Sequence, residues 1–396
     1  FYGPDATGDT ETLKRYVNEA KVLRAFAYYQ LVTTFGEVPL MVKPLTPVEI
    51  LQMKRSSVED VYALIEQDLL DATELPSKSQ YSADDQYRVT SGLAKTMLAK
   101  MYMFRGMFKE AETVLHEIVE VDQEYALLPD YGMNWRPQYV NSSESIFELP
   151  CLMYDKEIAS GTNAPHFFTS RAGDGYSGYG FHVPTTDLYN AYDKEDPRIT
   201  YVFTQTGDRY VGDTQEQNNT GSATGFHDYK MTVPRVEKEG YDVWMIPYNI
   251  RLIRYADVLL MYAEALNENG KASQALTYLN EVRDRARNTN PVDPRRDKQA
   301  YIPATTPNSL PAVTTTDKEA LRTAIWNERR FELAMEGWRR DDLMRQKRFG
   351  EVMKAYASKY NVEKGKNFKD DRDYLFPIPQ GEIDKSQGNL TQNRGY

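Results

Sequence analysis

Glycine and tyrosine concentrate in residues 171–181, which read RAGDGYSGYGF. Tyr176 and Tyr179 stand there on a backbone freed by four glycines, with Arg171 and Asp174 beside them. A tyrosine ring offers a rigid apolar face and a hydroxyl, which together suit a partly hydrated ligand. Loops on a rigid scaffold are also where binding surfaces usually lie. We therefore predict that this loop binds a ligand, and the alternative is a packed tyrosine loop without one.

Two of the four tryptophans lie in the same irregular part of the chain, and we predict that they add aromatic surface to the binding site. The other two, Trp326 and Trp338, fall on a predicted helix and are expected to be structural. The predicted ligand-binding residues are therefore Tyr176, Tyr179, Arg171, Asp174, Trp135 and Trp244.

The chain has no residue pattern that favours a metal or a cofactor. No two histidines have the i, i+4 spacing that presents two ligands from one helix, so we expect surface or capping roles for His116, His166, His182 and His227. Residues 173–178 fit G-x-G-x-x-G but follow no predicted strand and open no predicted helix, so the phosphate-binding geometry is missing. The single Cys151 excludes an internal disulfide and a cysteine-based zinc site.

Catalytic motifs are absent as well, since the chain contains no G-x-S-x-G elbow, P-loop or EF-hand spacing. Glu328, Glu332 and Glu336 stack along one predicted helix rather than facing each other across a cleft, which argues against a catalytic pair. A glycosidase pair drawn from distant parts of the chain stays open. We predict a protein that binds without catalysis.

Composition limits the class of partner. The 396 residues carry 41% hydrophobic and 27% charged side chains and a net charge of −10, as in a folded globular chain. This charge argues against nucleic acid and against a basic patch for an anionic bilayer. No run approaches the ~18 apolar residues that a membrane helix needs. Because the chain opens without a methionine or a signal segment, we expect its start to be processed or incomplete.

Helical periodicity dominates the first and last thirds of the chain. The pattern predicts helices over residues 11–35 and 57–72, and an antiparallel pair over 90–104 and 109–121 around Gly106. A second block is predicted over 251–267 and 273–287 around Gly270, followed by a helix over 318–338.

The two glycine turns align, and the flanking residues then match in size. With Gly106 set on Gly270, the matched pairs are Ala99 with Ala263, Tyr102 with Leu266, Ala111 with Ala275, Leu115 with Leu279, and Ile118 with Val282. Small residues let two helices approach closely and glycine forms the turn, which is the pattern of tetratricopeptide repeats. We predict two such helix pairs.

The middle of the chain, residues 129–247, is rich in Gly, Tyr, Asn, Thr and Asp and predicts loops with short strands at 145–149 and 199–203. We predict four segments in all. They are a helical scaffold with the first tetratricopeptide-like pair (1–128), an irregular ligand-binding region (129–250), a second helical block (251–350) and a C-terminal tail that packs back on the scaffold (351–396).

Four groups of residues together resemble the SusD/RagB family, in their order and spacing from residue 19 to the end. They are EAKVLRAF at 19–26 with FGEVPL at 35–40, IRYADVLLMYAEA at 253–265 with NEVR at 280–283, ERRFELAMEG at 328–337 with RDDL at 340–343, and FPIP at 376–379 with EI at 382–383 and QNRGY at 392–396.

The resemblance implies a mostly α, SusD-like fold, in which tetratricopeptide-type helix pairs form a scaffold and a loop-rich region with short strands packs on it. It also implies a lipid-anchored protein on the extracellular face of the bacterial outer membrane. Such a protein captures an oligosaccharide, or in the RagB-like branch a peptide, and delivers it to a SusC-like TonB-dependent transporter. Family members carry an N-terminal lipidated cysteine and a further segment before the first of these motifs, so we expect the membrane contact to lie outside this sequence.

Two other classes of function stay as alternatives. One is a tetratricopeptide scaffold that recognises only a protein partner, which would show an open helical groove and no aromatic pocket. The other is a glycan hydrolase, which would show two carboxylates about 5 to 9.5 Å apart beside a groove. Which glycan or peptide is bound is left open by the sequence.

The helical periodicity offers a structural explanation for the charged residues in these motifs. Arg24 falls within the apolar stripe of the helix over 11–35, and Glu328 falls within that of the helix over 318–338. A buried charge without a partner costs several kcal/mol. We therefore expect both side chains to be at least half buried and to join helices through ion pairs.

Overall fold

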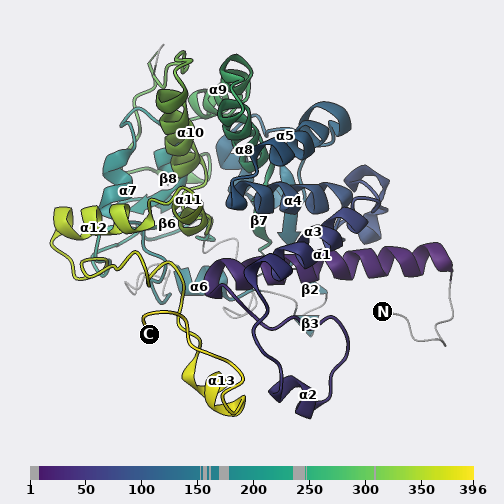
Figure 1. Ribbon diagram of the computed structural model, residues 1–396. Helices are drawn as coiled ribbons and strands as arrows, with labels where there is room; N and C mark the ends of the chain where they lie inside the picture. The colour runs from purple at the N-terminus through teal and green to yellow at the C-terminus, as the bar shows by residue number, and fades with distance from the viewer. Residues whose placement is uncertain are drawn as a thin grey trace. The chain divides into compact units, whose positions relative to one another are not determined.

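The computed structural model describes residues 9–151, 153–154, 158–159, 162–168, 178–234, 246, 248–306 and 309–396 (Figure 1). Contacts between residues divide the chain into two compact units. The first unit comprises Phe1–Ile118 and Arg340–Tyr396, and the second comprises Val119–Arg339. The fold is mostly α, as predicted. The four predicted segments stay a prediction about domain organisation.

The first unit is built on α1 (Thr10–Phe35), which packs against α3 (Val58–Ala72). Its other helices are α2 (Pro47–Leu51), α4 (Ser91–Arg105), α5 (Phe108–His116), α12 (Phe349–Tyr360) and α13 (Gln380–Lys385). The Asp9 carboxylate caps α1 by accepting from the Thr12 amide, and Gly36, at φ 71°, ends it. The chain end binds here too, because the Asn393 amide donates to the carbonyls of Phe35 and Phe376. The predicted helices over 11–35 and 57–72 are confirmed.

The second unit combines helices with four small antiparallel sheets. The strand pairs are β1 (Ser145–Leu149) with β7 (Ile250–Arg254), β2 (Met153–Tyr154) with β3 (Ile158–Ala159), β4 (Phe203–Gln205) with β6 (Phe226–Asp228), and β5 (Arg209–Tyr210) with β8 (Arg296–Lys298). The helices are α6 (Ala164–Phe168), α7 (Thr186–Ala191), α8 (Tyr255–Glu268), α9 (Ala272–Asn288) and α10 (Lys318–Glu332). Helix α11 (Arg339–Arg345) begins at Arg339, the last residue of the second unit.

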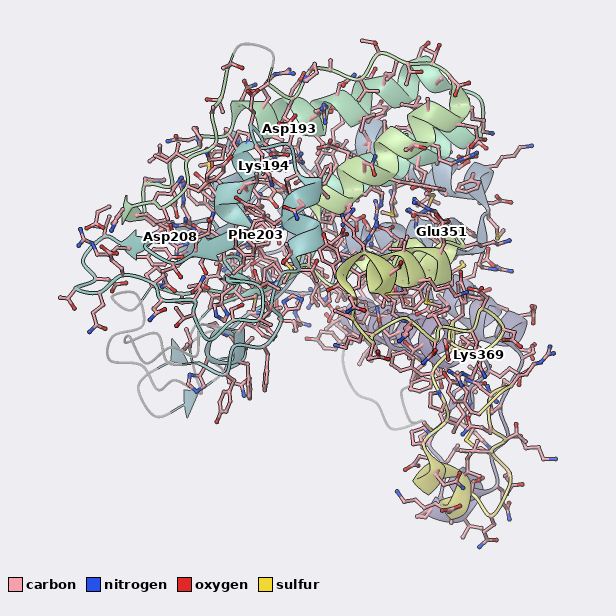
Figure 2. All side chains as sticks on the ribbon, turned by 90° about the vertical axis from the view of Figure 1, so that its left-hand side faces the viewer. Asp193, Lys194, Phe203, Asp208, Glu351 and Lys369 are labelled. Atoms are coloured by element: carbon pink, nitrogen blue, oxygen red, sulfur yellow. The ribbon has the colours of Figure 1, made fainter. Side chains whose placement is uncertain are left out.

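Short strands and 3₁₀ turns of this unit enclose an aromatic core. Phe203, on β4, packs with Tyr192, Ile199 and Val202, and the turn after β4 carries Asp208 (Figure 2). The Asp208 carboxylate accepts from the Arg296 guanidinium at 3.1 Å and from the Ala300 amide at 2.8 Å. These bonds hold the β4 turn against the β8 segment.

Three predicted elements differ from the structure. The helix predicted from residue 251 begins at Tyr255, because residues 250–254 pair with β1 as strand β7. The helix predicted over 318–338 ends at Glu332, and the chain turns through Met335 at φ 65° and Gly337 at φ 89°. A strand was expected over 199–203, but Pro197–Tyr201 forms a 3₁₀ helix that Asp196 caps, and strand β4 begins only at Phe203. Tertiary pairing and proline chemistry override local propensity at these places.

The two predicted helix pairs are confirmed, and their turns are the same. In α4–α5 the Met107 amide donates to the Tyr102 carbonyl at 2.9 Å, and in α8–α9 the Lys271 amide donates to the Leu266 carbonyl at 2.8 Å. Gly106 and Gly270 have φ of 73° and 80°. Every matched residue is buried: Ala99 and Ala263, Tyr102 and Leu266, Ala111 and Ala275, Leu115 and Leu279, and Ile118 and Val282.

Gly270→Ala is expected to lower the free energy of unfolding by about 1 kcal/mol, because a left-handed backbone strains a residue with a Cβ. Nothing lies within 4 Å of the position that the Cβ would take, so the loss is conformational and not steric. Gly381→Ala is the control, since Gly381 lies in α13 without a positive φ and with equally open space. Its expected effect is neutral or stabilising. Urea denaturation followed by circular dichroism measures both, and equal effects would contradict the conformational explanation.

The two charges expected within apolar stripes are both paired, and Glu328 is buried while Arg24 keeps 17% of its side chain exposed. Arg24 donates to both carboxylate oxygens of Asp68, at 2.7 and 2.6 Å, and so joins α1 to α3. Glu328 is 2% exposed and accepts from Arg198 at 2.6 Å and from Arg283 at 2.8 Å. The prediction that these charges join elements of the fold is confirmed.

Glu328 belongs to a larger set of linked charges in the second unit, which we call the buried ion network. Its members come from β7, α9, α10, the turn after α10 and the loop-rich region, and the side chains of all but Arg283 are at most 6% exposed. The cations are Arg198, Lys230, Arg254, Arg283 and Arg285, and the carboxylates are Glu144, Asp196, Glu328, Glu332 and Glu336.

Glu332 lies at the centre of this network. It pairs with Arg198, Arg254 and Arg285, and its side chain is fully buried. Burial raises the pKa of this carboxyl, but the three guanidinium groups more than offset burial and lower the pKa to about 2. Glu332 therefore stays charged and locks the loop-rich region to α9 and α10.

Candidate functional site

Three stacked aromatic rings lie at the surface of the second unit, and we call them the aromatic stack: Phe167, Tyr179 and Phe181. The ring centroids of Phe167 and Phe181 are 5.9 Å apart with planes 12° from parallel, and those of Tyr179 and Phe181 are 5.8 Å apart at 22°. His166 meets Tyr179 edge-on at 5.3 Å. Tyr179 is 39% exposed and Phe181 is 50% exposed. Ring surface is thus open to solvent.

The backbone holds the aromatic stack in place. The Tyr179 amide donates to the His166 carbonyl at 3.1 Å, and the Phe181 amide donates to the Phe167 carbonyl at 2.9 Å. Between them Gly180 adopts φ 64°, a conformation that glycine enters without strain. The rings of α6 and of residues 179–181 are therefore fixed relative to one another before any ligand arrives, which lowers the entropic cost of binding.

A cavity of about 350 Å³ lies beside the aromatic stack, and we call it the inner pocket. Helix α6 contributes to both features, because Phe167 belongs to the stack while Ala164 and Phe168 line the pocket. The full lining is Trp135, Ala164, Phe168, His182, Lys230, Met231, Tyr248, Asn249, Ile250, Arg251, Leu252, Met335, Glu336 and Gly337. His182 and Gly337 are exposed, whereas Trp135, Lys230 and Tyr248 are buried. The pocket therefore leads from the surface towards the buried ion network.

Lys230 and Glu336 connect the inner pocket to that network. The ammonium group donates to the Glu336 carboxylate at 2.6 Å and lies 4.5 Å from the centre of the Trp135 ring. Burial lowers the pKa of Lys230 to about 8, although Glu336 opposes this shift. The second carboxylate oxygen of Glu336 accepts from Arg254 at 2.8 Å. The two side chains are thus fixed in place and neutralise each other.

Two residues that line the inner pocket have a left-handed backbone although neither is glycine. His182 has φ 56° and Met335 has φ 65°. The His182 ring is held by the Asp228 carboxylate at 2.9 Å, and burial lowers its pKa while Asp228 raises it to a value above the usual one. Such strained positions cluster at ligand sites, where the surrounding fold holds them in place.

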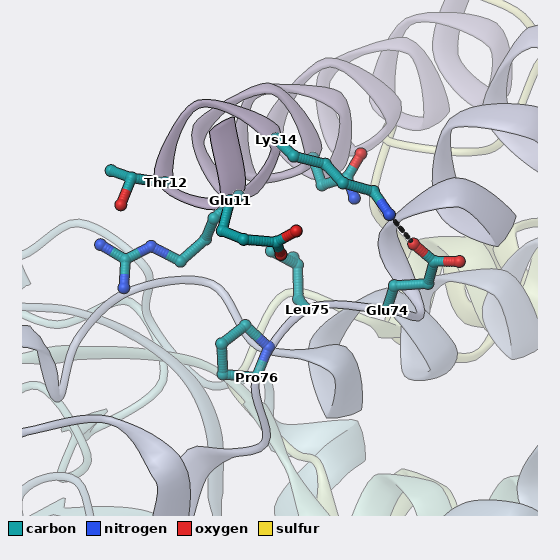
Figure 3. A pocket seen from close by; sticks show the side chains of 8 residues that line it. Glu11, Thr12, Lys14, Glu74, Leu75 and Pro76 are labelled. Atoms are coloured by element: carbon teal, nitrogen blue, oxygen red, sulfur yellow. Dashed lines mark ion pairs between the residues drawn. The ribbon is translucent and has the colours of Figure 1, made fainter. Parts of the chain in front are cut away.

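A second hollow, of about 240 Å³, lies in the first unit at the start of α1 (Figure 3). An ion pair between Lys14 and Glu74, with 2.5 Å between nitrogen and oxygen, lies across it. The eight residues that line it include no aromatic side chain. It therefore lacks the ring surface that the aromatic stack and inner pocket provide.

The predicted site residues fall in different places. Tyr179 belongs to the aromatic stack, and Trp135 lines the inner pocket with only 4% of its surface exposed. Arg171, Asp174, Tyr176 and Trp244 lie outside the described residues. The site assignment as a whole stays a prediction.

Sequence reasoning missed most of the residues that the structure brings together. Phe167 and Phe168 follow Pro165-His166 in an aromatic run that could have signalled the stack, whereas nothing local marks Lys230 or Tyr248. The expectation of a surface or capping role is wrong for His227, which is 1% exposed, since β6 packs its side chain inward.

The described helices include none that combines the length and apolar character required to span a bilayer. Groups of His, Cys, Asp and Glu arranged to hold a metal ion are also absent from the part of the chain that the structure describes.

Comparison with known families identifies the class of fold. Residues 143–396 match the SusD family, and residues 5–103 match a family described as "Starch-binding associating with outer membrane". The first match covers more than half of the chain, and this protein therefore belongs to the SusD family.

Several relatives resemble nearly the whole chain. SusD-like protein P2 of Formosa agariphila is 26% identical over 98% of this chain and 75% of its own length. The structure of a laminarin-binding SusD-like protein superposes with a TM-score of 0.78 at 27% identity, covering 99% of this chain and 81% of the other. Surface glycan-binding protein A from Bacteroides thetaiotaomicron, solved in complex with laminarihexaose, has a TM-score of 0.75 at 22% identity, covering 98% and 80%.

Proposed function

We propose that this protein is a non-catalytic glycan-binding protein that captures an oligosaccharide at the aromatic stack. The observation that carries the proposal is the exposed, pre-arranged set of Phe167, Tyr179 and Phe181 beside a pocket. Aromatic faces pack against the C–H faces of sugar rings, and nearby polar groups bond the hydroxyls. The laminarin-binding relative supports a β-glucan as the first ligand to test. A peptide ligand is the second candidate.

The proposal extends to the place of the protein in nutrient uptake. We infer that it is lipid-anchored at the extracellular face of the outer membrane and delivers its ligand to a SusC-like TonB-dependent transporter. Membership of the SusD family supports this role, as does the match to a family that associates with the outer membrane. Co-purification of a tagged chain with a TonB-dependent barrel from outer membranes tests the partner directly.

The carboxylates of the site support binding without turnover. Among the described residues that line the inner pocket, Glu336 is the one carboxylate, and Lys230 and Arg254 both bind it. A hydrolase needs a second carboxylate across the groove and an acid whose pKa is raised. Glu328 and Glu332 are buried in ion pairs instead, and the pKa of Glu332 is lowered.

Tyr179→Ala combined with Phe181→Ala is expected to weaken laminarihexaose binding by at least about tenfold, since each stacked ring contributes ~1 kcal/mol or more. Both side chains are well exposed, so the melting temperature should stay within a few degrees. Tyr16→Ala is the matched control, because Tyr16 is a 44% exposed aromatic residue of the first unit. Isothermal titration calorimetry measures binding of each variant, and product analysis by chromatography tests for turnover.

Undiminished binding by the double variant would remove the aromatic stack from the site. Binding of peptides but no glycan would favour the RagB-like alternative, and binding of neither would favour a tetratricopeptide scaffold for a protein partner. Tyr176→Ala with Tyr179→Ala tests the loop originally predicted from the sequence, with the same readouts.

A further inference from the structure

We propose that the inner pocket is a subsite for a single uncharged sugar ring and that it rejects sugars carrying a carboxylate or sulfate. This inference rests on the proposed glycan-binding function and adds a ligand class to it. It concerns the side chains that line the pocket and the way their charges are paired.

The size of the inner pocket suits one ring. Its volume is about 350 Å³. At roughly 30 Å³ for each water, this corresponds to about 12 waters, and a hexose has a similar number of non-hydrogen atoms. A glycan longer than one sugar ring must therefore extend out of the pocket. The aromatic stack offers the adjacent surface, because the consecutive residues Phe167 and Phe168 belong to the stack and to the pocket wall.

The chemistry of the lining suits a sugar. Trp135, Phe168 and Tyr248 supply aromatic surface, and Met231, Ile250 and Leu252 supply aliphatic surface. The polar groups among them are few and held in place by other bonds. The Asn249 amide donates to Glu148 at 3.0 Å, and the Tyr248 hydroxyl lies within hydrogen-bond distance of the carbonyls of Trp135 and Lys230, at 3.0 and 3.2 Å. A mostly apolar wall with a few fixed polar groups is typical of small-molecule sites.

Charge pairing argues for a neutral ligand. Three described residues that line the pocket can carry a positive charge, and each already has an acidic partner. Lys230 pairs with Glu336 at 2.6 Å, His182 with Asp228 at 2.9 Å, and Arg251 with Glu148 at 3.4 Å. An anionic sugar would meet cations whose charge is already compensated, and it would also lie near Glu336, the carboxylate among the described lining residues. Burying a charge without a partner costs several kcal/mol, whereas a hydroxyl avoids this cost.

The test compares laminarihexaose with the same hexaose oxidised to carboxylates at C6, using the full chain and calorimetry. The unmodified protein is expected to bind the neutral hexaose at least tenfold more tightly than the oxidised one. Ala164→Leu places a larger side chain in the pocket from α6, and it should weaken binding of the neutral hexaose at least tenfold. Ala320→Leu, at an exposed position of α10 that does not line the pocket, should leave binding unchanged.

A second pocket variant, Leu252→Phe on β7, serves if Ala164→Leu does not fold, which circular dichroism would show. Equal or tighter binding of the oxidised hexaose overturns the preference for neutral sugars. Unchanged binding by the folded pocket variants, while the aromatic-stack variant loses binding, overturns the pocket as a subsite but leaves the proposed function intact. Failure of the unmodified protein to bind the neutral hexaose contradicts the subsite and counts against a β-glucan as the ligand.

Discussion

Glu332→Gln is expected to lower the free energy of unfolding by about 3 to 5 kcal/mol at neutral pH. The substitution removes the central anion of the buried ion network and leaves Arg198, Arg254 and Arg285 with one fewer carboxylate each. These guanidinium groups are almost fully buried, so water cannot replace the lost partner. Glutamine has nearly the same shape, and the loss therefore reports charge rather than packing.

The same residue predicts a pH dependence. The pKa of Glu332 is about 2 in the folded protein, whereas the ordinary value for a glutamate is 4.5. Because the folded value is the lower one, the unfolded chain takes up the proton first as pH falls. The stabilisation by Glu332 is thus fully present above about pH 4.5 and disappears between there and pH 2, and it amounts to about 3 kcal/mol. In the Gln variant, the free energy of unfolding should not show this decrease between about pH 4.5 and pH 2.

Urea denaturation followed by tryptophan fluorescence measures both effects, since all four tryptophans belong to the second unit. Glu319→Gln is the control on the same helix, where the carboxylate is 75% exposed and pairs with Arg322. Its expected loss is below about 1 kcal/mol. The central role of Glu332 would be contradicted if both variants lost a similar free energy of unfolding. It would also be contradicted if Glu332→Gln still showed the full loss of stability between about pH 4.5 and pH 2.

Arg198→Met is expected to destabilise the second unit by about 3 to 5 kcal/mol. Arg198 is 0% exposed and binds three carboxylates from two parts of the chain, Asp196 beside it and Glu328 and Glu332 on α10. Methionine fills much of the volume but takes one buried cation away from each of these acids. Arg198 also joins the loop-rich region to α10, so ligand binding should weaken together with stability.

Arg209→Met is the matched control for this change. Its guanidinium group pairs with Asp297 at 2.8 Å, but both side chains are more than a third exposed. Solvent compensates for the loss of such a pair, and the expected effect is below about 1 kcal/mol. The same denaturation experiment compares the two variants. If Arg198→Met proved as mild as Arg209→Met, the network would be a weak contributor to the fold.

Local patterns predicted the scaffold well, because a helix repeats its contacts every three to four residues. The burial of Glu328 follows from its place on the same stripe as Leu321 and Ile325, one helical turn beyond Ile325, and the turn at Gly270 follows from the left-handed conformation that glycine permits. Arg198, the ion-pair partner of Glu328, lies 130 residues away in the sequence, and no local signal connects the two residues. Ion pairs of this kind are fixed by tertiary structure alone.

The candidate site was harder to predict for the same reason. The aromatic stack joins residues 166–168 to residues 179–181 through two backbone hydrogen bonds, and the inner pocket adds side chains from β7 and the turn after α10. The chain between Glu332 and Arg339 was predicted as continuous helix, so the turn that carries Met335 and Glu336 to the pocket was missed. The composition of the loop-rich region identifies Tyr179 and Trp135 as candidates, but it does not show which residues from other elements lie beside them.

The buried ion network also limits how this protein can change over generations. Its cations and carboxylates are equal in number, so a single replacement leaves a net charge in a dry interior. Replacing an acid and its base together by apolar residues restores the balance. Substitutions there should therefore be tolerated in pairs and not alone. The fold thus keeps a neutral interior only when both members of an ion pair change together.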